Sequence, residues 1–191
     1  MSDQWQTTNS TYGGWFGACL PPMISTKRHT PKVNDSGAEK VRTPKVVVDK
    51  ARKNLQETLD VYCLKERVVE GDGNCQFRAL SDQLYHEQDQ HRAVRQSIVE
   101  QLQMGADKYR DYVPQDYKSY VTGMSQDGCW GDHVTLQACA DRYGMPIYLI
   151  TSYDTDNVIQ VVPETTTSDS ALWLSFWAEI HYNSIVPKSI P

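Results

Sequence analysis

The chemistry that this sequence suggests centres on a cysteine that follows a glycine-rich turn, Gly71-Asp72-Gly73-Asn74-Cys75. Two glycines permit a tight turn with converging backbone N–H groups. A helical pattern starts at Cys75, and a helix start places partial positive charge at the sulfur, which favours the thiolate. The backbone N–H groups of Gly73, Asn74 and Cys75 are candidates for an oxyanion hole. The turn therefore suits acyl transfer by a cysteine nucleophile, although its spacing also fits a buried cysteine after a helix-capping turn.

A cysteine nucleophile needs a base, and five histidines compete for that role. His29 lies in a polar N-terminal segment. His86 and His91 flank a turn rich in Gln, Glu and Asp, where solvated histidines are the usual case. His133 is expected in the first turn of a helix, where the dipole disfavours the imidazolium that a base must become. These positions leave His181 as the candidate base.

The surroundings of His181 support this choice. Glu179, His181 and Asn183 alternate with Ile180 and Tyr182, as in a strand with one apolar face. Either polar neighbour could orient the imidazole and fix its tautomer, which is the third role in a catalytic triad. The same pattern also fits a half-buried histidine on an edge strand.

The elements that must position these residues fall into two groups along the chain. Apolar residues recur at helical spacing in segments 43–59, 75–84, 94–102, 117–124 and 132–144. Short β-branched or aromatic runs then occupy 147–150, 158–162, 172–174 and 179–183, and an extended lead-in at 63–70 precedes the glycine-rich turn. Helices first and strands later predict an α+β or three-layer α/β domain.

Composition places the chain among ordinary globular proteins, with 39% hydrophobic and 23% charged residues in 191. Residues 1–42 are rich in Ser, Thr, Gly, Asn, Pro and Lys and predict a flexible tail, followed by one domain over 43–191. The net charge of -5 argues against binding nucleic acid by bulk electrostatics. No apolar run approaches the roughly 18 residues of a membrane span, and no secretory signal is visible.

Cysteine usage indicates a reducing compartment. The five cysteines are odd in number and widely spaced, and no CxxC pair occurs. Cys129, His133 and Cys139 lack a fourth ligand and the close spacing of a structural zinc site, so we expect no metal.

Three motifs taken together resemble the ovarian-tumour (OTU) family of cysteine peptidases. They are Asp72-Gly-Asn-Cys75-Gln-Phe-Arg-Ala-Leu, Trp130-Gly-Asp132 and His181-Tyr-Asn183-Ser, in the family's order. The resemblance covers about residues 60–186, and the run Leu172-Trp-Leu-Ser-Phe-Trp is similar to OTU proteins of the plant type. It implies a papain-like fold with a small sheet flanked by helices, and a deubiquitinase that cleaves after the C-terminal glycine of ubiquitin without a cofactor.

The resemblance also implies residue roles. Cys75 is then the nucleophile, His181 the general base and Asn183 the orienting residue. Asp72 matches an acidic residue that is often counted as catalytic, although its local role could be to hold the oxyanion loop.

Two further residues next to these motifs could bind substrate. Trp130 either packs beside the cleft or contacts the ubiquitin tail, and Tyr182 either packs in the core or lines the channel for that tail. The expected partner is ubiquitin or polyubiquitin, with a ubiquitin-like modifier or a non-catalytic scaffold as alternatives. We expect a monomer in the cytoplasm, or also in the nucleus, that binds neither nucleic acid nor membranes.

Overall fold

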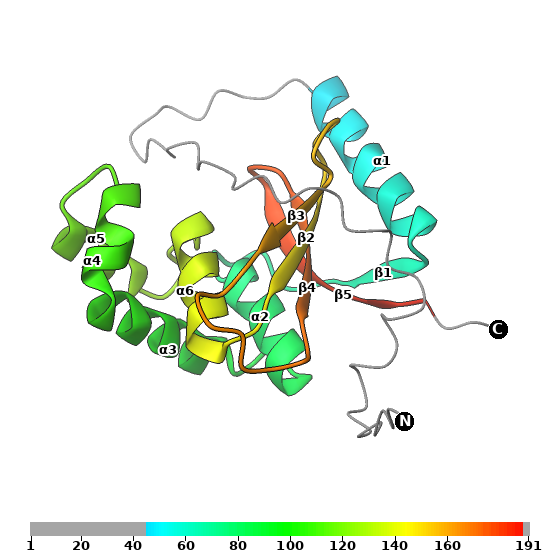
Figure 1. Ribbon diagram of the computed structural model, residues 1–191. Helices are drawn as coiled ribbons and strands as arrows, with labels where there is room; N and C mark the ends of the chain where they lie inside the picture. Colours follow the sequence, from blue (N-terminus) through cyan, green and yellow to red (C-terminus); the bar gives the residue numbers. More distant parts are fainter. Residues whose placement is uncertain (1–44, 189–191) are drawn as a thin grey trace, which may run out of the picture.

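The strands of the chain form one mixed five-stranded sheet, with helices on both of its faces (Figure 1). A computed structural model of the chain describes residues 45–188. The strands lie in the order β1-β5-β4-β2-β3, and every neighbouring pair is antiparallel except β2 and β4. Their bounds are β1 Leu64–Arg67, β2 Ile147–Thr151, β3 Val158–Val161, β4 Leu172–Trp177 and β5 His181–Pro187.

One face of the sheet is covered by helix α1, Lys45–Val61 (Figure 1). Leu55 and Leu59, which lie one helical turn apart in the predicted segment 43–59, are fully buried against Leu64, Trp173 and Ile185 of the sheet. Burial of a leucine side chain contributes roughly 1.5–3 kcal/mol, so this contact fixes α1 on the sheet. The predicted tail over residues 1–42 and the Thr43-Pro44 helix start lie outside the described residues.

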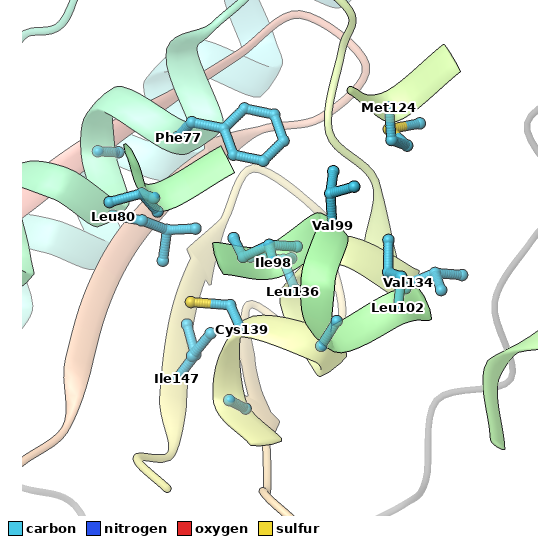
Figure 2. Close-up of a cluster of buried hydrophobic side chains, with 14 of the residues drawn as sticks. Phe77, Leu80, Ile98, Val99, Leu102, Met124, Val134, Leu136, Cys139 and Ile147 are labelled. Atoms are coloured by element: carbon cyan, nitrogen blue, oxygen red, sulfur yellow. The ribbon is translucent and has the colours of Figure 1, made fainter. Parts of the chain in front are cut away.

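The other face is covered by a larger group of helices. They are α2 Cys75–Tyr85, α3 His91–Met104, α4 Ala106–Tyr109, the short 3₁₀ helix η1 Arg110–Tyr112, α5 Tyr117–Met124 and α6 His133–Tyr143. Figure 2 shows part of the core between these helices and the sheet, a cluster that includes Phe77, Ile98, Leu136 and Ile147. All four are at most 2% exposed, so the helix that begins with Cys75 is anchored firmly against the sheet.

The α+β prediction, with most helices before most strands, is confirmed. Helix α6 begins and ends as expected. The Asp132 side chain accepts hydrogen bonds from the backbone N–H groups of Val134 (2.9 Å) and Thr135 (3.0 Å), and Gly144 ends the helix in the left-handed conformation at φ 60°. Within residues 45–188, no helix has the length and apolar character that crossing a bilayer requires.

The last strand differs from its prediction. We predicted strand over 179–183, but residues 178–180 form a turn and β5 runs from His181 to Pro187. Glu179 has φ 60° in that turn. It is therefore not the next strand position on the side of His181, and the alternation that made it a candidate orienting residue does not exist.

Candidate active site

The glycine-rich turn before Cys75 is held by the side chain of Asp72. One carboxylate oxygen accepts a hydrogen bond from the backbone N–H of Asn74 (3.0 Å), and the other accepts from the Asn74 side chain (3.0 Å) and from Arg78 (2.8 Å). The Arg78 guanidinium, with these amide donors, holds the pKa of Asp72 well below its usual range. Asp72 therefore stays ionised and fixes the turn. It also occupies the backbone N–H of Asn74, one of the three predicted oxyanion donors.

A second loop packs against the turn from the other side. Gly73 has φ 85°, and a Cβ atom there would lie 2.2 Å from the carbonyl oxygen of Gly128, so only glycine fits. The buried Asn74 side chain joins the two loops, because its Oδ1 accepts from the N–H of Gly128 (2.9 Å) and from Arg95 (2.6 Å). The backbone next to the candidate nucleophile is thus fixed by close packing and by buried hydrogen bonds.

Cys75 is the first residue of α2, as predicted, and is 7% exposed. Burial raises the pKa of its thiol. The backbone N–H groups of Tyr182 and Gln76 oppose this, but the pKa stays above the ordinary value, and the nearby charge of Asp72 adds to the rise. We expected the helix start to favour the thiolate. Burial outweighs the backbone donors at the helix start, so the structure favours the neutral thiol over the predicted thiolate.

This pKa shift predicts the pH dependence of alkylation at Cys75. The folded-state thiol ionises at higher pH than free cysteine, so its alkylation rate should rise through a midpoint above that of free cysteine. Iodoacetamide labelling, followed by mass spectrometry of the Cys75 peptide across a pH series, measures this midpoint. Denatured protein is the control and should titrate like free cysteine. A midpoint below that of free cysteine would instead indicate a resting thiolate–imidazolium pair.

His181 opens β5, on the strand that also places its neighbour Tyr182 at the Cys75 sulfur. A Cβ atom on Gly71 of the nucleophile turn would lie 3.9 Å from the His181 ring, so the imidazole sits over that turn. Its Nε2 lies 3.1 Å from Oδ1 of Asn183, two residues along the same side of the strand. The structure therefore brings Cys75, His181 and Asn183 to one place, where a thiol, an imidazole and an orienting amide can act together.

The structure separates the two residues predicted to bind substrate. Trp130 is 51% exposed, on the loop that packs against the nucleophile turn. Tyr182 points to the opposite face of β5 from His181, where its ring stacks on Phe176 with centroids 4.6 Å apart and packs against the core. Burial raises the pKa of the Tyr182 hydroxyl. About half of the Trp130 surface faces solvent, whereas the position of Tyr182 fits the packing alternative.

Three polar residues that hold the site were not among the predicted site residues. Gln76 donates to the carbonyl of Asp132 (3.0 Å) and accepts from Thr135 (2.7 Å), which ties α2 to α6. Arg95 reaches Asn74 from α3, and Glu66 accepts from the Asn183 side chain. Gln76 directly follows Cys75 in the motif, and this position could have identified it as a site residue. Arg95 and Glu66 lie outside the three motifs, so the sequence carried no comparable signal for them.

Cys129, His133 and Cys139 are the nearest approach to a metal-ligand cluster in the sequence. Among residues 45–188, no group of three or more His, Cys, Asp or Glu side chains is arranged to hold a metal ion. Burial raises the pKa of the Cys139 thiol, which lies wholly in the core and is a poor source of thiolate.

Comparison with known proteins decides the family. Residues 70–184 match the family model of the OTU-like cysteine protease. The chain belongs to this family. It is 49% identical to Arabidopsis thaliana OVARIAN TUMOR DOMAIN-containing deubiquitinating enzyme 12 over 168 residues, which are 88% of this chain and 71% of that protein. It is also 42% identical to enzyme 10 of the same plant over 95% of this chain but 49% of that protein, so the chain spans about half the length of some curated relatives.

Solved structures agree on the OTU fold. The OTU domain of OTUD1 superposes with a TM-score of 0.62 at 21% identity, covering 75% of this chain and 99% of that one. An OTU domain in complex with ubiquitin superposes with a TM-score of 0.54, also at 21% identity, covering 64% of this chain and 69% of that one. The predicted family and its fold are therefore confirmed, and the curated plant relatives agree with the plant-type resemblance.

Proposed function

We propose that this protein is a thiol-dependent deubiquitinase that hydrolyses isopeptide and peptide bonds after the C-terminal glycine of ubiquitin. The observation that carries the proposal is the meeting of Cys75, at the start of α2, with the His181–Asn183 pair of β5. Its relatives in Arabidopsis are named deubiquitinating enzymes, and one OTU domain with this fold was solved with ubiquitin. Both facts support ubiquitin as the substrate.

In the first half of the proposed reaction, His181 removes the thiol proton and the sulfur attacks the glycyl carbonyl carbon. The carbonyl π electrons move to oxygen, and the backbone N–H groups of Gly73 and Cys75 are the donors proposed to stabilise it. The intermediate collapses as the C–N bond breaks. The His181 imidazolium gives its proton to the departing lysine amine, which leaves a thioester on Cys75.

In the second half, water hydrolyses the thioester. His181, now neutral, takes a proton from water as the oxygen attacks the thioester carbon, and the C–S bond then breaks. The proton returns to the Cys75 sulfur, which restores the resting thiol. This chemistry uses sulfur and imidazole alone, so the proposal includes no metal and no organic cofactor.

The remaining site residues take supporting roles in this proposal. Asp72 holds the nucleophile turn through Asn74 and Arg78 and does not act on the substrate. The half-exposed Trp130 contacts the C-terminal tail of ubiquitin, and Tyr182 packs behind the strand of His181. We further propose a monomer that acts in the cytoplasm or nucleus on ubiquitin or polyubiquitin and binds no nucleic acid.

A ubiquitin probe with a C-terminal electrophile tests the proposal. The full chain should form a covalent adduct at Cys75, identified by mass spectrometry, and should cleave at least one diubiquitin in a panel of linkages. Probes built on ubiquitin-like modifiers run in parallel and should react more slowly. Binding of ubiquitin without an adduct would indicate a non-catalytic scaffold, and reaction with another modifier alone would reassign the substrate.

A further inference from the structure

A buried carboxylate outside the described triad faces the orienting asparagine. Glu66 lies on β1, next to β5, and its side chain is 6% exposed. One of its oxygens, Oε1, accepts hydrogen bonds from the side chains of Ser175 (2.5 Å), Asn183 (3.1 Å) and Arg52 (3.1 Å). The second oxygen pairs with the same guanidinium of Arg52, which reaches down from α1.

The charge on Glu66 is retained in this setting. Burial acts to raise the pKa of Glu66, but hydrogen bonds from Arg52, Ser175 and Asn183 outweigh it and hold the pKa below its ordinary value. An ionised carboxylate accepts hydrogen bonds and cannot donate them. Any side chain that meets Glu66 here must therefore present a donor.

That requirement determines which way the Asn183 amide points. Its NH₂ group must face Glu66, so its carbonyl oxygen must face the other way, towards the N–H of Val69 (3.0 Å) and Nε2 of His181 (3.1 Å). Since that oxygen only accepts, Nε2 of His181 carries the proton. The other ring nitrogen, Nδ1, is then unprotonated and is the atom that can act as base.

We propose that Glu66, held by Arg52, is a positioning residue that sets the tautomer of His181 through the Asn183 amide. The kinetic consequences rest on the proposed function, whereas the orientation of the Asn183 amide follows from the hydrogen bonds around Glu66 and Asn183. Both Glu66 and Arg52 precede residue 70, where the match to the family model begins. Helix α1 and strand β1 thus contribute to the catalytic site from outside the matched region.

A double-mutant cycle tests the proposal on the full chain. We expect Glu66→Ala to lower kcat for a fluorogenic ubiquitin substrate by about tenfold to 100-fold, with KM nearly unchanged, because His181 spends more time in the wrong tautomer or orientation. In an Asn183→Ala background the same change should lower kcat by less than about twofold, since the amide that transmits the effect is gone. A structural role alone would give equal losses in both backgrounds and would overturn the proposal.

Asp82 provides a matched control. It is a buried carboxylate bound to the same strand, accepting from Ser184 (2.5 Å) and pairing with Arg67 (2.9 Å), but on the other face of the sheet from Asn183. Asp82→Ala should lower the melting temperature and should have the same effect on kcat with and without Asn183. If Asp82→Ala instead couples to Asn183→Ala as strongly as Glu66→Ala does, Glu66 does not act on His181 through the Asn183 amide.

A pair of variants that exchanges the amide and the carboxylate keeps the test independent of loss of folding. Asn183→Asp places a second carboxylate against Glu66 and should reduce kcat strongly, because neither group can donate. Adding Glu66→Gln supplies an NH₂ donor in place of the repelling oxygen and should recover at least about fivefold of that loss. Failure of Glu66→Gln to rescue Asn183→Asp, with both variants folded by circular dichroism, would contradict the proposal.

Alkylation of Cys75 separates this inference from the proposed function. Iodoacetamide labelling at neutral pH should slow in Glu66→Ala to the rate seen in Asn183→Ala, whatever the physiological substrate is. A wild-type chain that cleaves no ubiquitin substrate would refute the deubiquitinase proposal. The labelling rates would still test the role of Glu66, because they do not depend on the substrate. Labelling of Glu66→Ala at the wild-type rate would overturn that role.

Discussion

Replacing Cys75 by alanine is expected to reduce cleavage of ubiquitin substrates by at least about 10³-fold. The side chain is the only group proposed to form a covalent bond to the glycyl carbon, and its loss leaves oxyanion donors and binding alone. The sulfur is nearly buried in its turn, so the smaller alanine should not disturb the fold. Initial rates on a fluorogenic ubiquitin substrate, with melting temperatures of both proteins, measure this effect.

Cys129 supplies the matched control for this variant. It lies on the neighbouring loop, where its sulfur contacts Met124 (4.0 Å) and the carbonyl of Trp130 (3.9 Å). Cys129→Ala should change kcat by less than about threefold, because its thiol has no part in the proposed reaction, and should lower stability by roughly 1 kcal/mol from lost packing. Retained cleavage in Cys75→Ala, or equal losses in both variants, would refute Cys75 as the nucleophile.

Local signals in the sequence were enough to predict that Cys75, the candidate nucleophile, begins a helix, and to predict several other elements. The glycine-rich turn, the helix that starts at Cys75 and both ends of α6 depend on residues within a few positions of each other. Asp132 caps its own helix, and Gly144 is where that helix stops. Such features are encoded by backbone preferences and short-range hydrogen bonds, so sequence reading recovers them.

The partners of the histidine depend on pairing between distant strands. Glu179 looked equivalent to Asn183 by alternation, but the tight turn from β4 into β5 places Glu179 in the left-handed region. Conversely, Glu66 reaches Asn183 only because β1 pairs with β5 across more than 100 residues. Neither the length of that turn nor the strand order follows from local pattern, so this part of the site could not be predicted.

The pKa of Cys75 was misjudged for a related reason. A helix start favours the thiolate through its partial positive charge, and that was the basis of the prediction. The strand of Tyr182 and the loop of Gly128 cover the turn instead, and burial disfavours the charged form more than the helix end favours it. Desolvation of the Cys75 thiol depends on tertiary packing, which cannot be predicted from the spacing of residues in the sequence.

Arg95 provides the second large effect that we expect. It lies on α3 three residues before Ile98 and seven before Leu102, and so shares the apolar face of that helix. It is 4% exposed and donates to Asn74 Oδ1 (2.6 Å), the Cys129 carbonyl (2.8 Å) and the Met124 carbonyl (2.9 Å). Burial lowers the pKa of its guanidinium, and the charge lies 3.8 Å from the centre of the Phe77 ring.

We expect Arg95→Met to destabilise the protein by about 3 kcal/mol, a fall in melting temperature on the order of 10 °C. Methionine fills much of the space but removes the guanidinium donor from three oxygens, of which Asn74 Oδ1 keeps only the N–H of Gly128. Because one of them belongs to Asn74, next to the nucleophile, kcat should also fall, by about tenfold. Thermal unfolding and initial rates at a temperature well below both midpoints separate the two effects.

The matched control lies one turn earlier on the same helix. Arg92 is 79% exposed and 3.8 Å from Asp127, so Arg92→Met should change stability by less than about 0.5 kcal/mol and leave kcat unchanged. Arg95→Lys should fall between the two, because an ammonium keeps the charge but cannot reach three oxygens with a planar fork. If Arg95→Met behaves like Arg92→Met, the nucleophile turn is held by Asp72 and the Gly73–Gly128 contact alone, and the buried guanidinium has no part in shaping it.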